Sequence, residues 1–259
     1  MARTFALVLA LGATASAQAP DATFRPAHLF GSHMVVPVGD LPIWGFGPPG
    51  AKVAIAASWG ADAEATIAAD GHWRGTLRVT DGNGPQTVTL RCGDATVSLD
   101  DVLVGDVWLG SGQSNMEMPV GKGWFTGVVD CEREIATANH PELRLFTVAR
   151  GTAGTPRDDV DGQWQVCSPA TVGTFSAAAY FFGRELQAHG HRPLGLVVSS
   201  WGGRSPGRGP PASIQGGTPD AHQPEHHGAQ RLPESVHHQH GDGQEPGEAL
   251  QRLPDQPCG

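Results

Sequence analysis

Asp101-Val-Leu-Val-Gly-Asp-Val-Trp-Leu-Gly-Ser-Gly-Gln-Ser-Asn-Met-Glu-Met-Pro119 is the most informative stretch of this sequence. Its apolar run from Val102 to Leu109 is typical of a strand that is buried on both faces. The run leads through Gly110 and Gly112 to Ser114, where a sharp turn would lift the hydroxyl off the sheet and let the following backbone N–H groups face a developing oxyanion. A serine in a glycine-rich loop is more often part of a plain turn, so the pattern alone leaves both roles open.

The segments after this stretch alternate between strand and helix patterns. Leu143–Val148 and Leu194–Ser199 are two further apolar runs of the buried-strand type. Between them, Phe175–Gln187 carries apolar residues near helical spacing, and Ser176 is placed to cap that helix. Strand, helix and strand in this order indicate an α/β domain with a parallel sheet.

Residues 24–104 have a different pattern, with short strands separated by turn signals such as Asp81-Gly82-Asn83-Gly84-Pro85. The stretches that read as strands are Val53–Ala57, Thr66–Ala69, Trp73–Val79, Thr87–Arg91 and Ala95–Leu99. Strands at roughly 8–12-residue spacing without a helical period predict a small β-sandwich. Such a fold by itself suggests support or carbohydrate binding rather than catalysis.

The composition of the last part of the chain changes abruptly after Gly203. Residues 204–259 are rich in Pro, Gly and His, with few aliphatic residues and no Phe, Trp or Tyr. Such a segment cannot bury enough apolar surface to offset its chain entropy, so we expect it to be disordered. It contains the histidines His222, His226, His227, His237, His238 and His240. Nothing rigid positions them, which favours unstructured His-rich composition over a base or metal cluster.

The overall charge and the N-terminus restrict where the protein acts and what it meets. A formal net charge of −9 argues against nucleic acid or an anionic membrane as a main partner. Arg3, a short apolar run and Ala15-Ser16-Ala17 predict a signal peptide over residues 1–17, and therefore a secreted or periplasmic protein.

The four cysteines fit no zinc or Cys-x-x-Cys pattern; they are Cys92, Cys131, Cys167 and Cys258. A bridge between Cys131 and Cys167 and a pair of buried free thiols remain equally open.

Three motif blocks and a weaker upstream pattern resemble one known family. The segment 104–119 resembles the first motif block of the sialate O-acetylesterases, which are carbohydrate acetylesterases of the SGNH-hydrolase type. The segments Phe175-Ser-Ala-Ala-Ala-Tyr-Phe-Phe-Gly-Arg-Glu-Leu186 and Gly195-Leu-Val-Val-Ser-Ser-Trp-Gly-Gly203 resemble two further stretches of the family in the expected order. Upstream, Leu29-Phe30, Met34-Val35 and Pro42-Ile43-Trp44-Gly45 are similar to the leading β-sandwich of the family, so the resemblance covers residues 27–203.

The resemblance implies a β-sandwich domain over 24–104, followed by a flavodoxin-like SGNH α/β hydrolase domain over 105–203. It implies that Ser114 is the nucleophile and that its own backbone N–H helps to bind the oxyanion. Gly202 matches a glycine whose N–H is a second oxyanion donor, although a plain turn glycine remains the alternative. The implied substrate is an O-acetylated carbohydrate, sialic acid or a related sugar, and the implied chemistry needs no metal or other cofactor.

The sequence departs from the family after Gly203. The family has a Gln-Gly-Glu-x-Asn-like segment, which supplies an oxyanion-hole Asn, and an Asp-x-x-His segment, which supplies the general base. Neither is present, and no Asp after Gly203 has a His three residues later. We therefore expect an SGNH domain that is incomplete, truncated or frameshifted after Gly203, and little or no esterase activity from this chain. The alternative is a non-catalytic carbohydrate-binding or vestigial module.

Overall fold

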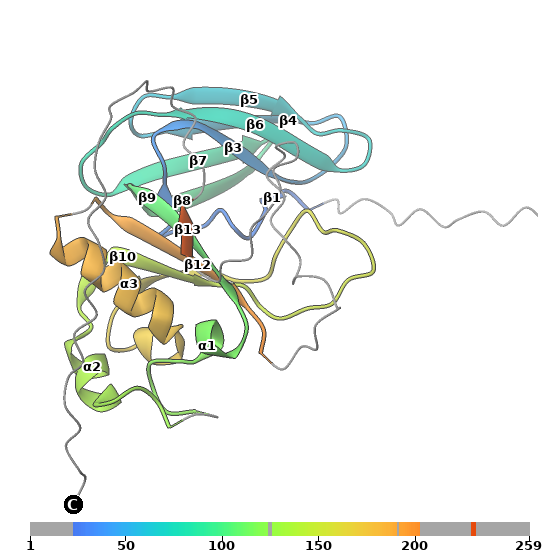
Figure 1. Cartoon of the computed structure of the whole chain (residues 1–259). Coiled ribbons are helices and arrows are strands. Elements are labelled where there is room, and N and C mark those ends of the chain that lie inside the picture. The colour runs from blue at the N-terminus through green and yellow to red at the C-terminus, as the bar shows by residue number, and fades with distance from the viewer. Residues whose placement is uncertain (1–22, 124–125, 191, 203–228, 232–259) are drawn as a thin grey trace, which may run out of the picture.

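The computed structural model describes residues 23–123, 126–190, 192–202 and 229–231. Within these ranges the chain forms three sheets and three α-helices, so the prediction of an α/β chain is confirmed. Residues 25–104 form two of these sheets, and the strands after residue 105 form the third. In Figure 1 this third sheet lies between the two N-terminal sheets and the helices. The predicted signal peptide, 1–17, lies outside the described residues, as does Cys258.

Residues 25–104 form two of the sheets. A three-stranded sheet has the order β1-β3-β6, and a five-stranded sheet has the order β2-β8-β7-β4-β5. The strands are β1 (Arg25–Pro26), β2 (Val35–Val36), β3 (Gly39–Phe46), β4 (Lys52–Ala57), β5 (Asp62–Thr66), β6 (His72–Val79), β7 (Gln86–Cys92) and β8 (Ala95–Val104). Buried and exposed residues alternate along β6, and the inward side chains of both sheets belong to one apolar cluster.

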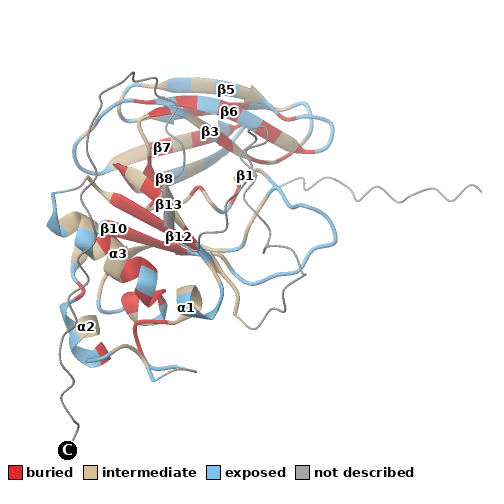
Figure 2. Ribbon diagram, viewed as in Figure 1, coloured by how far each residue is buried: buried red, intermediate tan, exposed pale blue. Residues whose placement is uncertain are grey.

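The third sheet has the order β11-β10-β12-β9-β13, in which β9, β10 and β12 are parallel. Its elements and the helices are β9 (Asp106–Gly112), α1 (Ser114–Glu117), α2 (Cys131–Thr137), β10 (His140–Thr147), β11 (Trp164–Cys167), a 3-10 turn (Val172–Thr174), α3 (Ala177–Ala188), β12 (Leu194–Ser200) and β13 (Ala229–Arg231). The expected strands at Leu143–Val148 and Leu194–Ser199 are confirmed as β10 and β12. The burial colours of Figure 2 show that β12 is largely buried.

Both faces of this third sheet are covered, which explains its continuous apolar strands. Phe146 and Val197 join the apolar cluster of the N-terminal sheets. Their neighbours Leu145 and Leu196 belong to a second cluster that includes residues of α3. The predicted helix is confirmed over Ala177–Ala188, and the Ser176 hydroxyl caps it by accepting the Ala179 N–H at 3.3 Å.

Two expected strands differ from the structure. The apolar run Val102–Leu109 is not one strand: β8 ends at Val104 and β9 begins at Asp106, in another sheet. The chain turns at Gly105, where a Cβ atom would lie 1.9 Å from the carbonyl oxygen of Pro193. The strand expected at Thr66–Ala69 lies earlier, at β5, because the backbone of Ile67 instead bonds the loop residues Ala51 and Gly50.

A buried ion pair joins the N-terminal sheets to the third sheet. Arg144 of β10 is 4% exposed, and its guanidinium donates to both carboxylate oxygens of Asp101. The imidazole of His33 bonds the same carboxylate, at 2.7 Å. The hydrogen bonds from Arg144 hold the pKa of Asp101 below its ordinary value.

Cys92, Cys131 and Cys167 are buried free thiols in the structure, so the alternative of a Cys131–Cys167 bridge is not the one observed. Burial raises the pKa of Cys167 to about 12, which keeps its thiol protonated and unreactive. The predicted disordered tail, 204–259, lies outside the described residues except for Ala229–Arg231. There the structure has a strand instead, because the free edge of β9 offers backbone partners over Trp108–Gly110.

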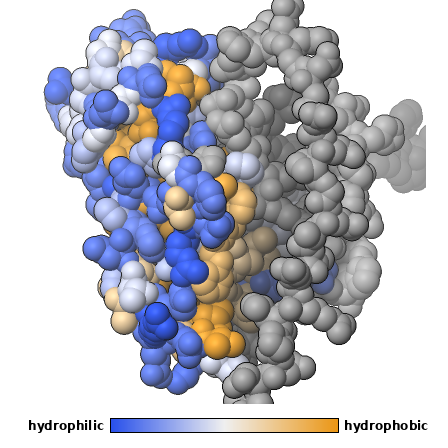
Figure 3. Space-filling view, turned by 60° about the vertical axis from the view of Figure 1, so that its left-hand side comes forward, coloured by the Kyte–Doolittle hydropathy of each residue, from blue (hydrophilic) through white to orange (hydrophobic). Residues whose placement is uncertain are grey.

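Hydrophilic residues make up much of the described surface that faces the viewer in Figure 3, and apolar residues gather in a strip along one side of it. Among the described residues, no helix is long and apolar enough to cross a membrane.

Candidate active site

The candidate site lies where the three parallel strands of the third sheet end. Ser114 follows β9, Arg150 follows β10 and Gly202 follows β12. Strands β9 and β12 are adjacent and pair in register up to Gly112 and Ser200. Because parallel strands place their carboxyl ends at one edge of the sheet, residues distant in sequence meet there, at the position where ligands bind in open α/β sheets.

The turn after β9 presents Ser114 to solvent. Ser114 is the first residue of the one-turn helix α1 and is exposed, as are its neighbours Gln113 and Asn115. Met116 and Met118 are partly buried and pack against the apolar cluster that includes residues of α3. The short helix is closed by the N–H groups of Glu117 and Met118, which donate to the carbonyl oxygens of Gln113 and Ser114 at 3.0 Å each. The first N–H groups of a helix have no partner within it, so they are available to an anion.

Gly202 lies directly beside Ser114. A Cβ atom added to Gly202 would be 3.2 Å from Ser114 Cα and 3.3 Å from Ser114 Cβ. The preceding residue holds the turn in place, since the Trp201 N–H donates to the carbonyl oxygen of Gly112 at 3.1 Å. The two residues predicted for the site are therefore neighbours in space.

The carboxylate of Glu117 links the two turns, a contact that the sequence does not reveal. The N–H of Gly202 donates to Glu117 Oε2 at 2.7 Å, and Glu117 Oε1 forms an ion pair with Arg150. The Glu117 side chain is only 9% exposed, whereas that of Arg150 is 54% exposed. Arg150 therefore neutralises a largely buried negative charge that lies next to Ser114.

Two requirements of serine catalysis are not met within the described residues. The Ser114 hydroxyl has no hydrogen bond there, and none of the described histidines contacts it. The N–H of Gly202 already donates to Glu117, so an oxyanion would have to replace that carboxylate as its acceptor. Nor do the described residues include a group of three or more His, Cys, Asp or Glu side chains that could hold a metal ion.

Comparisons with known proteins identify similar sequences and a similar structure. The human and mouse proteins named sialate O-acetylesterase are each 34% identical to this chain, over 201 and 220 residues. These matches cover 70% and 77% of this chain but 37% and 39% of the human and mouse proteins, so the chain spans about two fifths of the length of these curated relatives. No family model matches the chain.

The crystal structure of a carbohydrate acetylesterase from Xanthomonas citri is similar in fold, with a TM-score of 0.64 and 33% sequence identity. The similarity covers 70% of this chain and 41% of that protein.

Proposed function

Because the chain belongs to the sialate O-acetylesterase family, we propose that it carries the nucleophile half of an esterase that removes O-acetyl groups from sialic acid or a related sugar. The observation that supports this most directly is the placement of Ser114, exposed at the carboxyl edge of the sheet with Gly202 against it. Ester hydrolysis by a serine needs such an exposed hydroxyl with backbone N–H groups close by.

In the proposed reaction, Ser114 Oγ attacks the carbonyl carbon of the acetyl group while a general base takes the hydroxyl proton. The carbonyl oxygen becomes an oxyanion, which the N–H groups of Ser114 and Gly202 would stabilise. For this, the N–H of Gly202 must release the Glu117 carboxylate and donate to the oxyanion instead. The sugar oxygen leaves and takes the proton from the base. In the second half of the reaction the base takes a proton from water, the water attacks the acetyl-serine, and acetate is released as Ser114 Oγ recovers its proton.

The general base is the part of this reaction that none of the described residues provides. The family places it in an Asp-x-x-His segment, and the printed sequence has no such segment after Gly203. We propose that the reading frame of the coding sequence shifts at Gly203 and that this chain is inactive or nearly so. A version of the protein in which the frame after Gly203 supplies both missing segments is called the frame-restored protein below.

The other parts of the chain would support and export the esterase domain. Residues 24–104 would form a β-sandwich that supports the esterase domain over 105–203, and residues 1–17 would direct export. The two N-terminal sheets share one apolar cluster, which supports a sandwich. The occupied N–H of Gly202 supports the second candidate function, a non-catalytic carbohydrate-binding module.

Acetate release from O-acetylated N-acetylneuraminic acid tests the proposed function. The frame-restored protein is expected to release acetate, and Ser114→Ala is expected to abolish the release. Ser111→Ala is the matched control, since Ser111 is exposed in the same glycine-rich segment but lies within β9. Unchanged acetate release from the Ser114→Ala variant would refute the assignment.

Gly202→Ala is expected to lower hydrolysis by the frame-restored protein on the order of 100–1000-fold, the usual cost of losing one oxyanion donor. The added methyl group would lie 2.5 Å from Glu117 Oε2 and 3.2 Å from Ser114 Cα, so the Glu117 carboxylate must shift and the turn must give way against the backbone of Ser114. Gly151→Ala is the control, because nothing lies within 4 Å of a Cβ atom there. Steady-state rates on an aryl acetate give the comparison, and equal rates for the two variants would remove Gly202 from the oxyanion site.

A further inference from the structure

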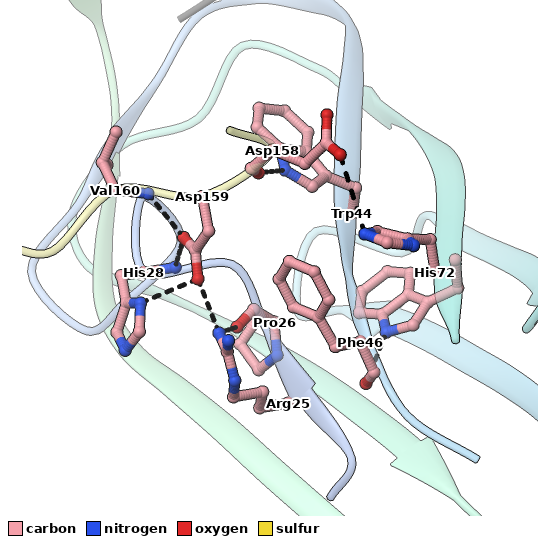
Figure 4. Close-up of polar contacts among 10 residues, drawn as sticks. Arg25, Pro26, His28, Trp44, Phe46, His72, Asp158, Asp159 and Val160 are labelled. Atoms are coloured by element: carbon pink, nitrogen blue, oxygen red, sulfur yellow. Dashed lines mark hydrogen bonds and ion pairs between the residues drawn. The ribbon is translucent and has the colours of Figure 1, made fainter. Parts of the chain in front are cut away.

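A cleft of about 530 Å³ lies outside the Ser114 site, between the β1-β3-β6 sheet and the segment Pro156–Val160. Figure 4 shows Asp158 of this segment beside Trp44, and Asp159 beside Arg25 and His28. It belongs to the long connection from β10 to β11, the same connection that carries Arg150 at its start. None of the residues that line the cleft belongs to the turns around Ser114 and Gly202.

Hydrogen bonds fix the segment against the sheet, so the wall of the cleft is built into the fold. The carboxylate of Asp159 accepts from Arg25 at 2.7 Å, and from the backbone N–H and the imidazole of His28 at 2.8 Å each. Burial alone would raise the pKa of Asp159, but the hydrogen bonds from Arg25 and His28 outweigh it and hold the pKa below its ordinary value. The indole of Trp44 donates to the carbonyl oxygen of Asp158 at 2.8 Å.

The lining of the cleft combines aromatic rings with hydrogen-bonding groups. Trp44 contributes an indole ring, the buried Trp73 closes the cleft from the core side at 2% exposure, and His72 lies between two carboxylates. Its Nδ1 is 3.4 Å from Asp70, and its Nε2 is 3.7 Å from Asp158. Both carboxylates are largely exposed, at 68% and 77%, and have acceptor capacity left for hydroxyl groups.

Two guanidinium groups in the cleft have no acidic partner among the residues that the structure describes. Arg74 and Arg157 are exposed, line the cleft and form no ion pair within the described ranges. The guanidinium of Arg74 lies over the Trp44 ring, 5.5 Å from its centroid. On the same face of β6, by contrast, Arg78 pairs with Asp40 at 2.9 Å. A guanidinium without a counter-ion is a ready partner for a carboxylate.

We propose that this cleft binds a pyranose that carries a carboxylate group, as a sugar site separate from Ser114. Arg74 and Arg157 would bind the carboxylate, Asp70, His72 and Asp158 the hydroxyl groups, and the indole ring of Trp44 the apolar face of the sugar ring. The protein would then hold an acidic glycan at a second place besides the proposed esterase site. It rests on that function only for the class of ligand, since binding at this cleft needs no hydrolysis.

Titration of the full 259-residue chain with N-acetylneuraminic acid tests the proposal, with the neutral carboxamide of the same sugar as the isosteric comparison. Backbone and indole N–H shifts report binding. The acid is expected to shift the indole N–H of Trp44 and to bind about tenfold more tightly than the carboxamide, as expected for loss of one charge-assisted hydrogen bond. Arg74→Ala and Arg157→Ala should each remove most of this difference.

Arg78→Ala is the matched control and should bind the acid like the parent chain, as should Ser114→Ala. Thermal midpoints of all variants check that each one is folded. Equal affinities for the acid and the carboxamide, an unchanged affinity in Arg74→Ala, or shifts confined to the Ser114 turn would each overturn the proposal. Binding of the acid at this cleft together with a frame-restored protein that releases no acetate would count against the proposed function alone.

Discussion

Restoring the reading frame after Gly203 is expected to raise the turnover of an aryl acetate on the order of a million-fold over that of the 259-residue chain. A serine hydroxyl is a weak nucleophile at neutral pH and needs a positioned base to take its proton. In a serine protease dissected by mutation, removing the histidine base alone costs about this factor in turnover. The described residues place no histidine at Ser114, so the chain should show at most the small rate that backbone donors provide.

The comparison is made between the two purified proteins at equal concentration, each with its Ser114→Ala variant as the blank. The Ser114→Ala change should matter only in the frame-restored protein. The 259-residue chain could instead hydrolyse the ester at a rate similar to that of the frame-restored protein and lose this activity in its Ser114→Ala variant. A base from outside the described residues would then activate Ser114. The proposal of an inactive chain would then be wrong.

Arg144→Met is expected to lower the free energy of unfolding by about 3 kcal/mol, because it leaves the Asp101 carboxylate without its main partner. The side chain of Arg144 is 4% exposed and that of Asp101 is 30% exposed, so solvent and His33 compensate only in part. Urea denaturation followed by fluorescence measures the change.

Arg192→Met is the control, since Arg192 pairs with Asp81 between the same two parts of the molecule but both side chains are exposed, at 40% and 80%. A change below about 1 kcal/mol is expected there.

The two variants should also differ in acid. The pKa of Asp101 is lower in the folded protein than in the unfolded chain. The ion pair with Arg144 therefore stabilises the fold fully at pH values above the ordinary aspartate pKa near 3.9, and this stabilisation is lost as the pH falls through the pKa of the folded protein. Arg144→Met should therefore lose part of this pH dependence, and an unchanged acid profile would contradict the assignment.

Much of the third sheet could be predicted from the sequence because its strands are covered on both faces. Continuous apolar runs marked β10 and β12 to within one residue at each C-terminal end, and helical spacing with Ser176 marked α3. The half-exposed strands before residue 104 carry weaker signals. There β5 was expected four residues too late, because Ala63 and Ala65 give little contrast with their polar neighbours.

The interior of the candidate site could be predicted only in part. Motif resemblance selected Ser114 and Gly202, and the parallel pairing of β9 with β12 explains why they meet. The contact of Glu117 with Gly202 and Arg150 depends on which strand ends lie side by side, and sequence spacing carries no sign of it. The same is true of the cleft, where β3 and β6 meet a segment that follows β6 by about 80 residues and β3 by about 110.

Covalent capture of the nucleophile tests whether Ser114 is the reactive serine. The frame-restored protein is treated with a fluorophosphonate, which forms a stable adduct with an activated serine, and the modified peptide is sequenced by mass spectrometry. The account predicts a single adduct on Ser114 and none on Ser111, the exposed serine of the same segment. An adduct on Ser111 or on another residue, with Ser114 unmodified, would contradict it.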